Sequence, residues 1–231
     1  VEVLGTDTPG LVIDGGGFAL LRYAGQSLLL RDITLRNGRG ARAGCLASNA
    51  TLSTQVFDSR FFDCRTDGSA ASGSAGGALF AFGPLRLTRT RFEGNAAYDG
   101  GIDNLSLGGG AVSSSGSSLL IENSAFVGNL TVRTVRPAGG CFDGVGGALS
   151  ASIDAGGSAL LSGVEFSANA HRCGTPTGAY SGQGGAVSIF GPSSGALPQF
   201  SIDSSFFGGN RSANGGAIFA RAVALNISNA S

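Results

Sequence analysis

The sequence predicts an all-β solenoid, a parallel β-helix of about six to seven rungs, on the strength of two alternating motifs. The first motif, Gly-Gly-Ala followed by Leu, Val or Ile, recurs at intervals of 31 to 38 residues. The second, Phe-x-x-Asn, falls between successive copies of the first. Repetition at a period of about 20 to 50 residues is typical of solenoids, whose units bury their apolar faces only by stacking. The first motif begins at Gly76, Gly109, Gly146, Gly184 and Gly215.

Short strands, and not helices, are expected between the motifs. Paired glycines in every repeat disfavour helix, and no apolar stripe of helical period extends beyond two turns. In the segment LRLTRTRF (85–92), Leu85 and Leu87 alternate with Arg86 and Thr88. This period of two is that of a strand with one buried face. Strands in end-to-end units favour a parallel β-helix with rungs about 4.8 Å apart.

Each motif has a predicted place in the rung. A repeated Asn suits an inner corner, because its amide donates to one neighbouring rung and accepts from the other. Phe three residues earlier should form a column of rings in the core. Gly-Gly should mark a corner where positive φ or close packing leaves no room for Cβ. The predicted ladder is Asn95, Asn129, Asn169 and Asn210, and the predicted ring column is Phe92, Phe126, Phe166 and Phe207.

The remaining ladder positions and the two ends complete the predicted rungs. Asn37 and Cys64 are assigned to the ladder position of the earlier repeats, and a seventh rung begins within 223–231. We expect one domain over 1–231, with a capping rung over 1–40 because a terminal rung must manage an exposed edge. The last rung is expected to continue in a longer chain or to meet another molecule.

The alternation of GGA(L/I/V) and FxxN over about 33–231 resembles the repeats of the chlamydial polymorphic outer-membrane proteins and of wider bacterial and algal extracellular repeat proteins. The resemblance implies a right-handed parallel β-helix of the pectin-lyase-like kind, displayed outside the cell and used in adhesion. It implies no cofactor and no catalytic residues. No metal site is expected either, because the cysteine spacings fit no zinc-ligand pair and His171 is the only histidine. This chain departs from the pattern at Cys64, which replaces the ladder Asn, and at Cys45, which replaces the Ala of GGAL.

The composition gives no sign of a nucleic-acid partner, of binding to an anionic membrane surface or of a membrane-spanning helix. Fifteen basic residues, all Arg, balance 15 Asp and Glu. The neutral charge favours neither nucleic acid nor an anionic membrane surface as a partner. The sequence contains no apolar run of the roughly 18 residues that a spanning helix requires.

The four cysteines predict two disulfides, for which three pairings exist. Cys141 and Cys173 lie in the long segments between Asn and Gly-Gly of consecutive rungs, so their bridge would join adjacent loops. Cys45 and Cys64 would then pair by elimination, although both also suit buried small-hydrophobe positions. Disulfides would indicate an oxidising, extracellular compartment.

Six Asn-x-Ser/Thr sequons suggest a secreted glycoprotein, since such sites accept N-linked glycans. The alternative is that Asn and Ser are simply frequent in β-helix turns. Asn129 and Asn210 belong to the predicted inward ladder, where a glycan would not fit. The expected glycosylation sites are therefore Asn49 and Asn104, followed by Asn226 and Asn229.

An enzymatic alternative is a polysaccharide lyase or hydrolase, which would need converging acids in a groove. Glu93 follows a stacked Phe and Glu165 precedes one, and we expect this difference to point the two side chains apart. The best acidic cluster, Asp99 with Asp103 joined by Asp143, could bind a cation, but such Asp residues more often form Asx-turns. His171 is expected to be a loop residue and not a general base.

We therefore expect a non-catalytic surface adhesin or a structural subunit of an extracellular fibre. The variable segments between the ladder residue and Gly-Gly are the expected contact loops, for cell-surface or matrix glycans or proteins. Arg60, Arg86, Arg89 and Arg91 are expected to form a modest outward basic stripe. The candidate contact residues are Tyr98, Arg133, Arg136, Phe142 and Tyr180.

Overall fold

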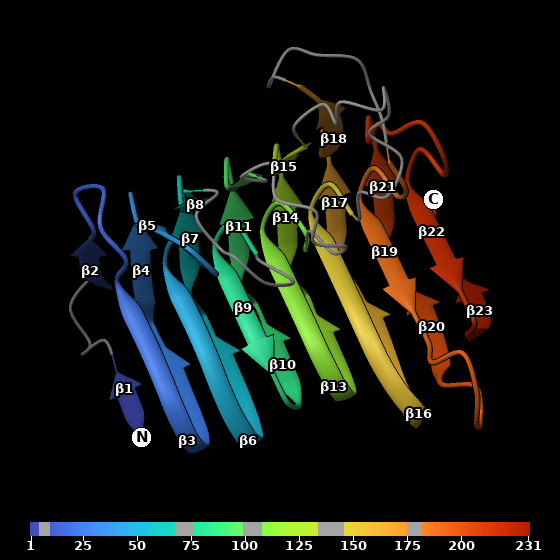
Figure 1. The fold of residues 1–231 in the computed structure, drawn as a ribbon, viewed down its shortest axis with the longest axis horizontal. Coiled ribbons are helices and arrows are strands. Elements are labelled where there is room, and N and C mark those ends of the chain that lie inside the picture. The colour runs from blue at the N-terminus through green and yellow to red at the C-terminus, as the bar shows by residue number, and fades with distance from the viewer. Residues whose placement is uncertain (5–9, 68–75, 99–107, 134–145, 175–181) are drawn as a thin grey trace.

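The computed structural model describes residues 1–4, 10–67, 76–98, 108–133, 146–174 and 182–231. All regular elements in these ranges are β-strands, and every strand pairing is parallel. Figure 1 shows the strands following one another along the long axis, from β1 and β2 beside the N-terminus to β22 and β23 beside the C-terminus. The structure is a parallel β-helix, as the repeats predict.

The largest sheet contains 11 strands and forms the long side of each rung. Its strands bend at a common level, where the register shifts or a strand divides in two, as between β9 and β10. The strands of this first sheet are β1 (Glu2–Leu4), β3 (Leu21–Arg31), β6 (Leu46–Phe57), β9 (Leu79–Phe82), β10 (Leu85–Thr88), β13 (Val112–Glu122), β16 (Leu149–Ser162), β19 (Val187–Phe190), β20 (Gln199–Asp203), β22 (Ile218–Arg221) and β23 (Ala224–Ser228).

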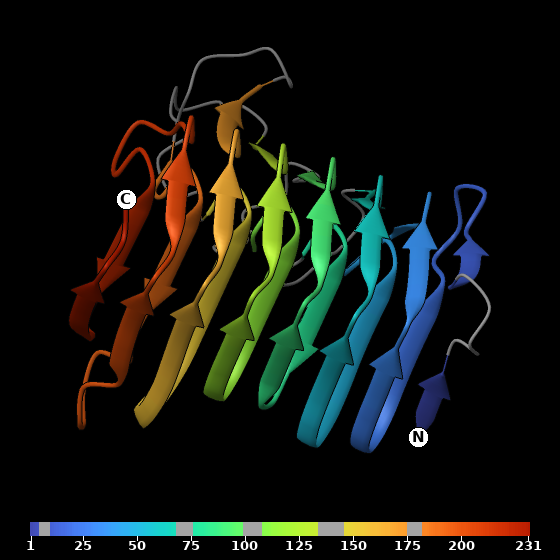
Figure 2. The ribbon, with the colours of Figure 1, turned by 180° about the vertical axis from the view of Figure 1, so that it is seen from behind.

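Two narrower sheets form the other sides of the rung, and Figure 2 shows the column from behind with the rungs again in chain order. The second sheet has seven strands and carries the Phe of each motif. It comprises β2 (Leu11–Asp14), β4 (Ile33–Arg36), β7 (Arg60–Phe62), β11 (Arg91–Glu93), β14 (Ala125–Val127), β17 (Glu165–Ser167) and β21 (Phe206–Gly208). The third sheet comprises β5 (Arg39–Gly40), β8 (Arg65–Thr66), β12 (Ala96–Tyr98), β15 (Leu130–Arg133) and β18 (Ala170–Cys173).

The core runs up the inside of the coil. The residue after each Ala of the GGA motif points inward and is fully buried at Leu79, Val112, Leu149 and Val187. These positions lie opposite one another in neighbouring strands, so each rung adds one layer to a continuous apolar column. This arrangement explains why an isolated repeat could not bury its own apolar face.

Close packing, and not positive φ, explains most of the paired glycines. A Cβ on Gly110 would overlap the carbonyl oxygen of Gly147 and the backbone of Leu130. The equivalent Gly77 and Gly147 face the next rung in the same way. Positive φ occurs within this motif at Gly184 and Gly215. Adjacent rungs therefore approach too closely at this corner for any side chain.

The first repeat corrects one part of the sequence prediction. Leu35 lies opposite Phe61 and Arg36 opposite Phe62, which places Asn37 opposite Asp63 and Gly38 opposite Cys64. Asn37 is thus one position away from the ladder, and Gly38 occupies the ladder position. Residues 1–40 contain regular strands of the column, so their capping role stays a prediction. No helix in the described ranges is long and apolar enough to cross a membrane.

Candidate functional site

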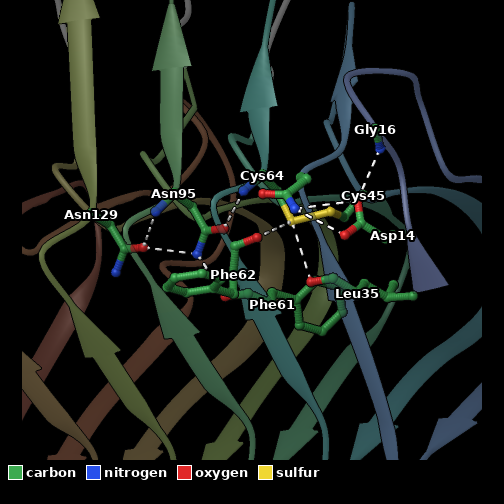
Figure 3. The surroundings of a disulfide bond; sticks show 10 residues. Asp14, Gly16, Leu35, Cys45, Phe61, Phe62, Cys64, Asn95 and Asn129 are labelled. Atoms are coloured by element: carbon green, nitrogen blue, oxygen red, sulfur yellow. Dashed lines mark hydrogen bonds between the residues drawn. A yellow bond between two sulfur atoms is a disulfide. The ribbon is translucent and has the colours of Figure 1, made fainter. Parts of the chain in front are cut away.

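The asparagine ladder forms the inner corner between the second and third sheets (Figure 3). Asn129 Oδ1 accepts from the backbone N of Asn95 at 3.1 Å and from its Nδ2 at 3.0 Å. Asn129 Nδ2 donates to Phe92 O and to Oδ1 of Asn169, and Asn169 repeats the pattern with Asn210. Asn95, Asn129 and Asn169 are almost fully buried. Each side chain therefore satisfies backbone groups that the corner would otherwise leave unpaired.

The phenylalanine column lies beside the ladder. Consecutive rings from Phe61 through Phe92, Phe126 and Phe166 to Phe207 have centroids 4.7 to 5.0 Å apart and planes within 14° of parallel. The spacing of the rings is that of the rungs themselves. All except the last ring are fully buried.

A disulfide ends the ladder (Figure 3). Cys64 occupies the ladder position, and its backbone N donates to Asn95 Oδ1 as a ladder Asn would. Its Sγ is bonded to Cys45, 19 residues earlier, and lies 3.6 Å from Leu35 O. That carbonyl is the counterpart of Phe61 O, which accepts from the Asn95 amide. Because Gly38 has no Cβ, Cys45 Sγ fits in the next ladder position.

The second predicted disulfide is described at one end only. Cys173 is disulfide-bonded, and no cysteine in the described ranges is free. Its predicted partner Cys141 lies outside the described residues.

Sequence reasoning missed a second polar column, at the corner between the first and second sheets. Buried hydroxyls of Ser59, Thr90, Ser124 and Ser205 occupy it. Ser124 Oγ accepts from the backbone N of Thr90 and donates to Glu122 O. The signal was available, because Ser or Thr stands two residues before Phe in four of the five motifs.

A shallow groove of about 280 Å³ crosses the outer face of the second sheet. Arg60 lies beside Thr34 on one strand and Arg91 on the other, and the ring of Phe62 is 42% exposed. Arg60 forms no ion pair with any described residue. The groove is lined by Thr34, Arg36, Arg60, Phe61, Phe62, Arg91 and Glu93.

Both other arginines of this groove are paired with carboxylates. Arg36 Nε lies 2.8 Å from Asp14 Oδ2, and Arg91 Nε lies 2.8 Å from Glu93 Oε2. The backbone N–H of Gly16, followed by Arg36, holds the pKa of Asp14 below its usual value. Among the described residues, Arg60 is therefore the arginine of this groove that forms no ion pair, although Asp32 and Asp58 line an adjoining depression with it.

The predicted basic stripe is not continuous. Arg91 lies directly opposite Arg60, but Arg86 is on the first sheet and bonds Glu122 at 3.0 Å. Arg89 stands at the intervening corner with a φ of 49° and forms a two-point ion pair with Asp58. The hydrogen bonds from Arg89 lower the pKa of the Asp58 carboxyl.

The prediction that Glu93 and Glu165 point apart was wrong. Residues on either side of an inward-facing Phe share the outer face of a strand, so both carboxylates point outward. They belong to strands separated by β14, and each has its own partner. Glu93 is bonded to Arg91, and Glu165 accepts from the hydroxyl of Ser167.

The sequons differ in how the fold places them. The Asn129 side chain is buried within the ladder, and Asn210 is half-buried there. Asn49 is half-exposed in β6, and Asn226 is exposed in β23. Asn229 is exposed, but its Nδ2 donates to Asp203 at 3.0 Å. Asn104 lies outside the described residues.

Few of the predicted loop contacts are described. Tyr98 is half-buried at the end of β12, and its backbone N donates to the hydroxyl of Thr66. Arg133 ends β15. His171, predicted to be in a loop, is instead fully buried within β18. The predicted residues outside the described ranges are Arg136, Phe142 and Tyr180 in the loops, and Asp99, Asp103 and Asp143 in the acidic cluster.

Comparisons with protein-family models, with curated proteins and with solved structures find no match for this chain.

Proposed function

We propose that this chain is a non-catalytic extracellular glycoprotein that acts as an adhesin or as a structural subunit of an extracellular fibre or appendage. The disulfide of Cys45 and Cys64 supports this proposal, because such bonds persist mainly in oxidising compartments. Two continuous columns of buried Asn and Phe support a stiff rod that can hold a binding face in a fixed geometry.

The adhesive role rests on the groove around Arg60. A guanidinium binds a carboxylate or a sulfate through two parallel hydrogen bonds, and Arg60 forms no ion pair with a described residue. Phe62 offers an exposed apolar ring beside it, against which the flat face of a sugar can pack. Arg60 and Phe62 together suit an anionic glycan of a cell surface or matrix.

The test measures binding of the chain to sulfated and uronate-containing polysaccharides by surface plasmon resonance, with a neutral polysaccharide as reference. Arg60→Ser is expected to weaken binding at least fivefold. Arg22→Ser is the matched control, because Arg22 is an exposed arginine on the first sheet and away from the groove. Binding should also fall steeply between about 0.1 and 1 M salt, where the screening length drops from about 10 to 3 Å.

Equal losses for both arginine variants, or binding that ignores charge, would contradict the adhesive role of the groove. Shortening of the polysaccharide during the assay would instead favour the lyase or hydrolase alternative.

The fibre version rests on strand edges. In the described sheets β22 pairs only with β19, and β23 only with β20. The inward-facing Leu225 and Ile227 of β23 remain 46% and 49% exposed. Unpaired edges accept further strands, from another copy or from additional rungs. Light scattering and electron microscopy test this version, and a monodisperse monomer without filaments would count against it.

A further inference from the structure

The strand β6 carries one sequon on its outer face. Ser48 and Ala50 point into the core and are fully buried, whereas Asn49 between them points outward and is half-exposed. No described residue hydrogen-bonds the Asn49 amide. Thr51, the third sequon residue, is exposed where the strand bends. The Asn49 side chain therefore lies on the outer face of β6 without a hydrogen bond to a described residue.

An exposed aromatic ring lies on the neighbouring rung. Leu46, Ala47 and Ser48 pair with residues 79, 80 and 81 of β9, so the register places Asn49 opposite Phe82. Side chains at such positions lie on the same face, with their strands about 4.8 Å apart. The Phe82 side chain is 57% exposed, although it sits in a regular strand. A group attached to Asn49 would therefore extend next to this ring.

The surface beyond Phe82 is hollowed. A depression of about 230 Å³ lies between Thr51 and Phe82 and continues over the glycines of the bend. This volume is below the roughly 300 to 1,000 Å³ of typical small-molecule sites. Its lining is Thr51, Phe82, Gly83, Pro84, Ser115, Gly116, Ser117 and Asp154.

The ladder sequon shows by contrast what the fold excludes. The Asn129 amide donates to Phe92 O and Asn169 Oδ1 in the core, so a substituent on its Nδ2 would break the ladder. Asn226 is exposed on the outer face of the first sheet and serves as a second open sequon.

We infer that Asn49 carries an N-linked glycan whose first sugar packs on the ring of Phe82. This inference rests on the proposed extracellular function, which takes the chain through a glycosylating compartment. The donor is a lipid-linked oligosaccharide diphosphate. A bond forms between Asn49 Nδ2 and the anomeric carbon, the bond from that carbon to the diphosphate oxygen breaks, and an amide proton leaves to a base. The apolar face of the sugar then covers the aromatic surface that the fold leaves exposed.

The experiment uses the full chain secreted from a eukaryotic host that makes N-glycans, trimmed enzymatically to one sugar at each site. Peptide mass spectrometry reports occupancy at Asn49 and Asn226, and thermal unfolding compares the wild type with Asn49→Gln. We expect an occupied Asn49 and a melting temperature higher by about 2–4 °C than that of Asn49→Gln. In a Phe82→Ser background the sugar should give no such gain, as a double-mutant cycle would show.

The matched control is Phe206→Ser, which removes an exposed ring from the second sheet and should leave the gain unchanged. A bare Asn49 beside an occupied Asn226, or an equal gain with and without Phe82, would overturn the inference. The proposed function fails separately, if material isolated from its natural source is intracellular with free thiols. The secreted host therefore tests Asn49 independently of the natural location.

Discussion

The position of Cys64 predicts that this disulfide can be exchanged for one more rung of the asparagine ladder. The perturbation is the pair Cys45→Ala and Cys64→Asn, which restores the residues of the GGAL and FxxN motifs. A new Asn at position 64 would donate to Leu35 O and to Asn95 Oδ1, as Asn95 does to Phe61 O and Asn129 Oδ1. Removing Cys45 Sγ vacates the space at Gly38 that the new side chain needs.

The magnitude follows from two opposing contributions. A disulfide between residues 19 apart lowers the entropy of the unfolded chain, which in the chain-entropy account raises the free energy of unfolding by about 3 kcal/mol. The double variant Cys45→Ala/Cys64→Ala should lose about that much free energy of unfolding. Each of the two new hydrogen bonds contributes about 0.5–1.5 kcal/mol net, so Cys45→Ala/Cys64→Asn should recover about 1–3 kcal/mol of the loss.

The assay is guanidinium unfolding followed by far-ultraviolet circular dichroism, on both double variants and on the wild type. The wild type should be the most stable, then the Asn variant, then the Ala variant. If the Asn variant were no more stable than the Ala variant, position 64 would not be a ladder position in energetic terms. The reasoning from register would then be refuted.

Two further predictions concern the ladder and the acid sensitivity of the fold. Asn129→Ala removes the side-chain hydrogen bonds to Asn95, Phe92 and Asn169 and should cost about 3 kcal/mol or more in denaturant unfolding. The control Asn226→Ala should stay within about 0.5 kcal/mol, and equal costs would contradict the ladder's role. Hydrogen bonds from the hydroxyl of Ser228, then from Asn229 and Ser204, lower the pKa of Asp203 in the folded state below 3.8. Stability from this carboxylate is therefore complete above that value and lost as pH falls through the lower folded pKa. Melting temperatures should be measured between about pH 2 and 7, a range that covers the titration of carboxylates. On acidification the melting temperature of Asp203→Asn should fall less than that of the wild type. An equal fall in both proteins would contradict this assignment.

The repeats were sufficient to predict both buried columns. When Asn or Phe stands at the same position in every rung, the adjacent rung places a residue of the same type beside it. The repeat period alone therefore brings Phe92 next to Phe126 and Asn95 next to Asn129. The hydroxyl column had a signal two residues before Phe in four of the five motifs, with Val164 as the exception. Sequence reasoning missed it because Ser and Thr are common elsewhere in this chain.

The sequence predictions were wrong where the repeat is irregular, or where a turn residue changes the sheet face on which the following side chains lie. Asn37 precedes a glycine that takes the ladder position, and the pairing of Leu35 with Phe61 settles this one-residue shift. Arg86, Arg89 and Arg91 are close in sequence, yet an intervening corner places them on two sheets and at the bend between them. Turns of variable conformation thus separate residues that a simple alternation would keep on one face.

The sequence by itself determined the solenoid, its rung period and the residues of its inner columns, because these depend only on identical residues stacking on one another. Tertiary structure decided what lies on the outside. The lack of an ion pair to Arg60 among the described residues, the exposure of Phe82 beside Asn49 and the contact of Cys45 with the Gly38 position all depend on contacts between different rungs. Those contacts follow from the register and from the bends of each coil, which residue type and spacing do not specify.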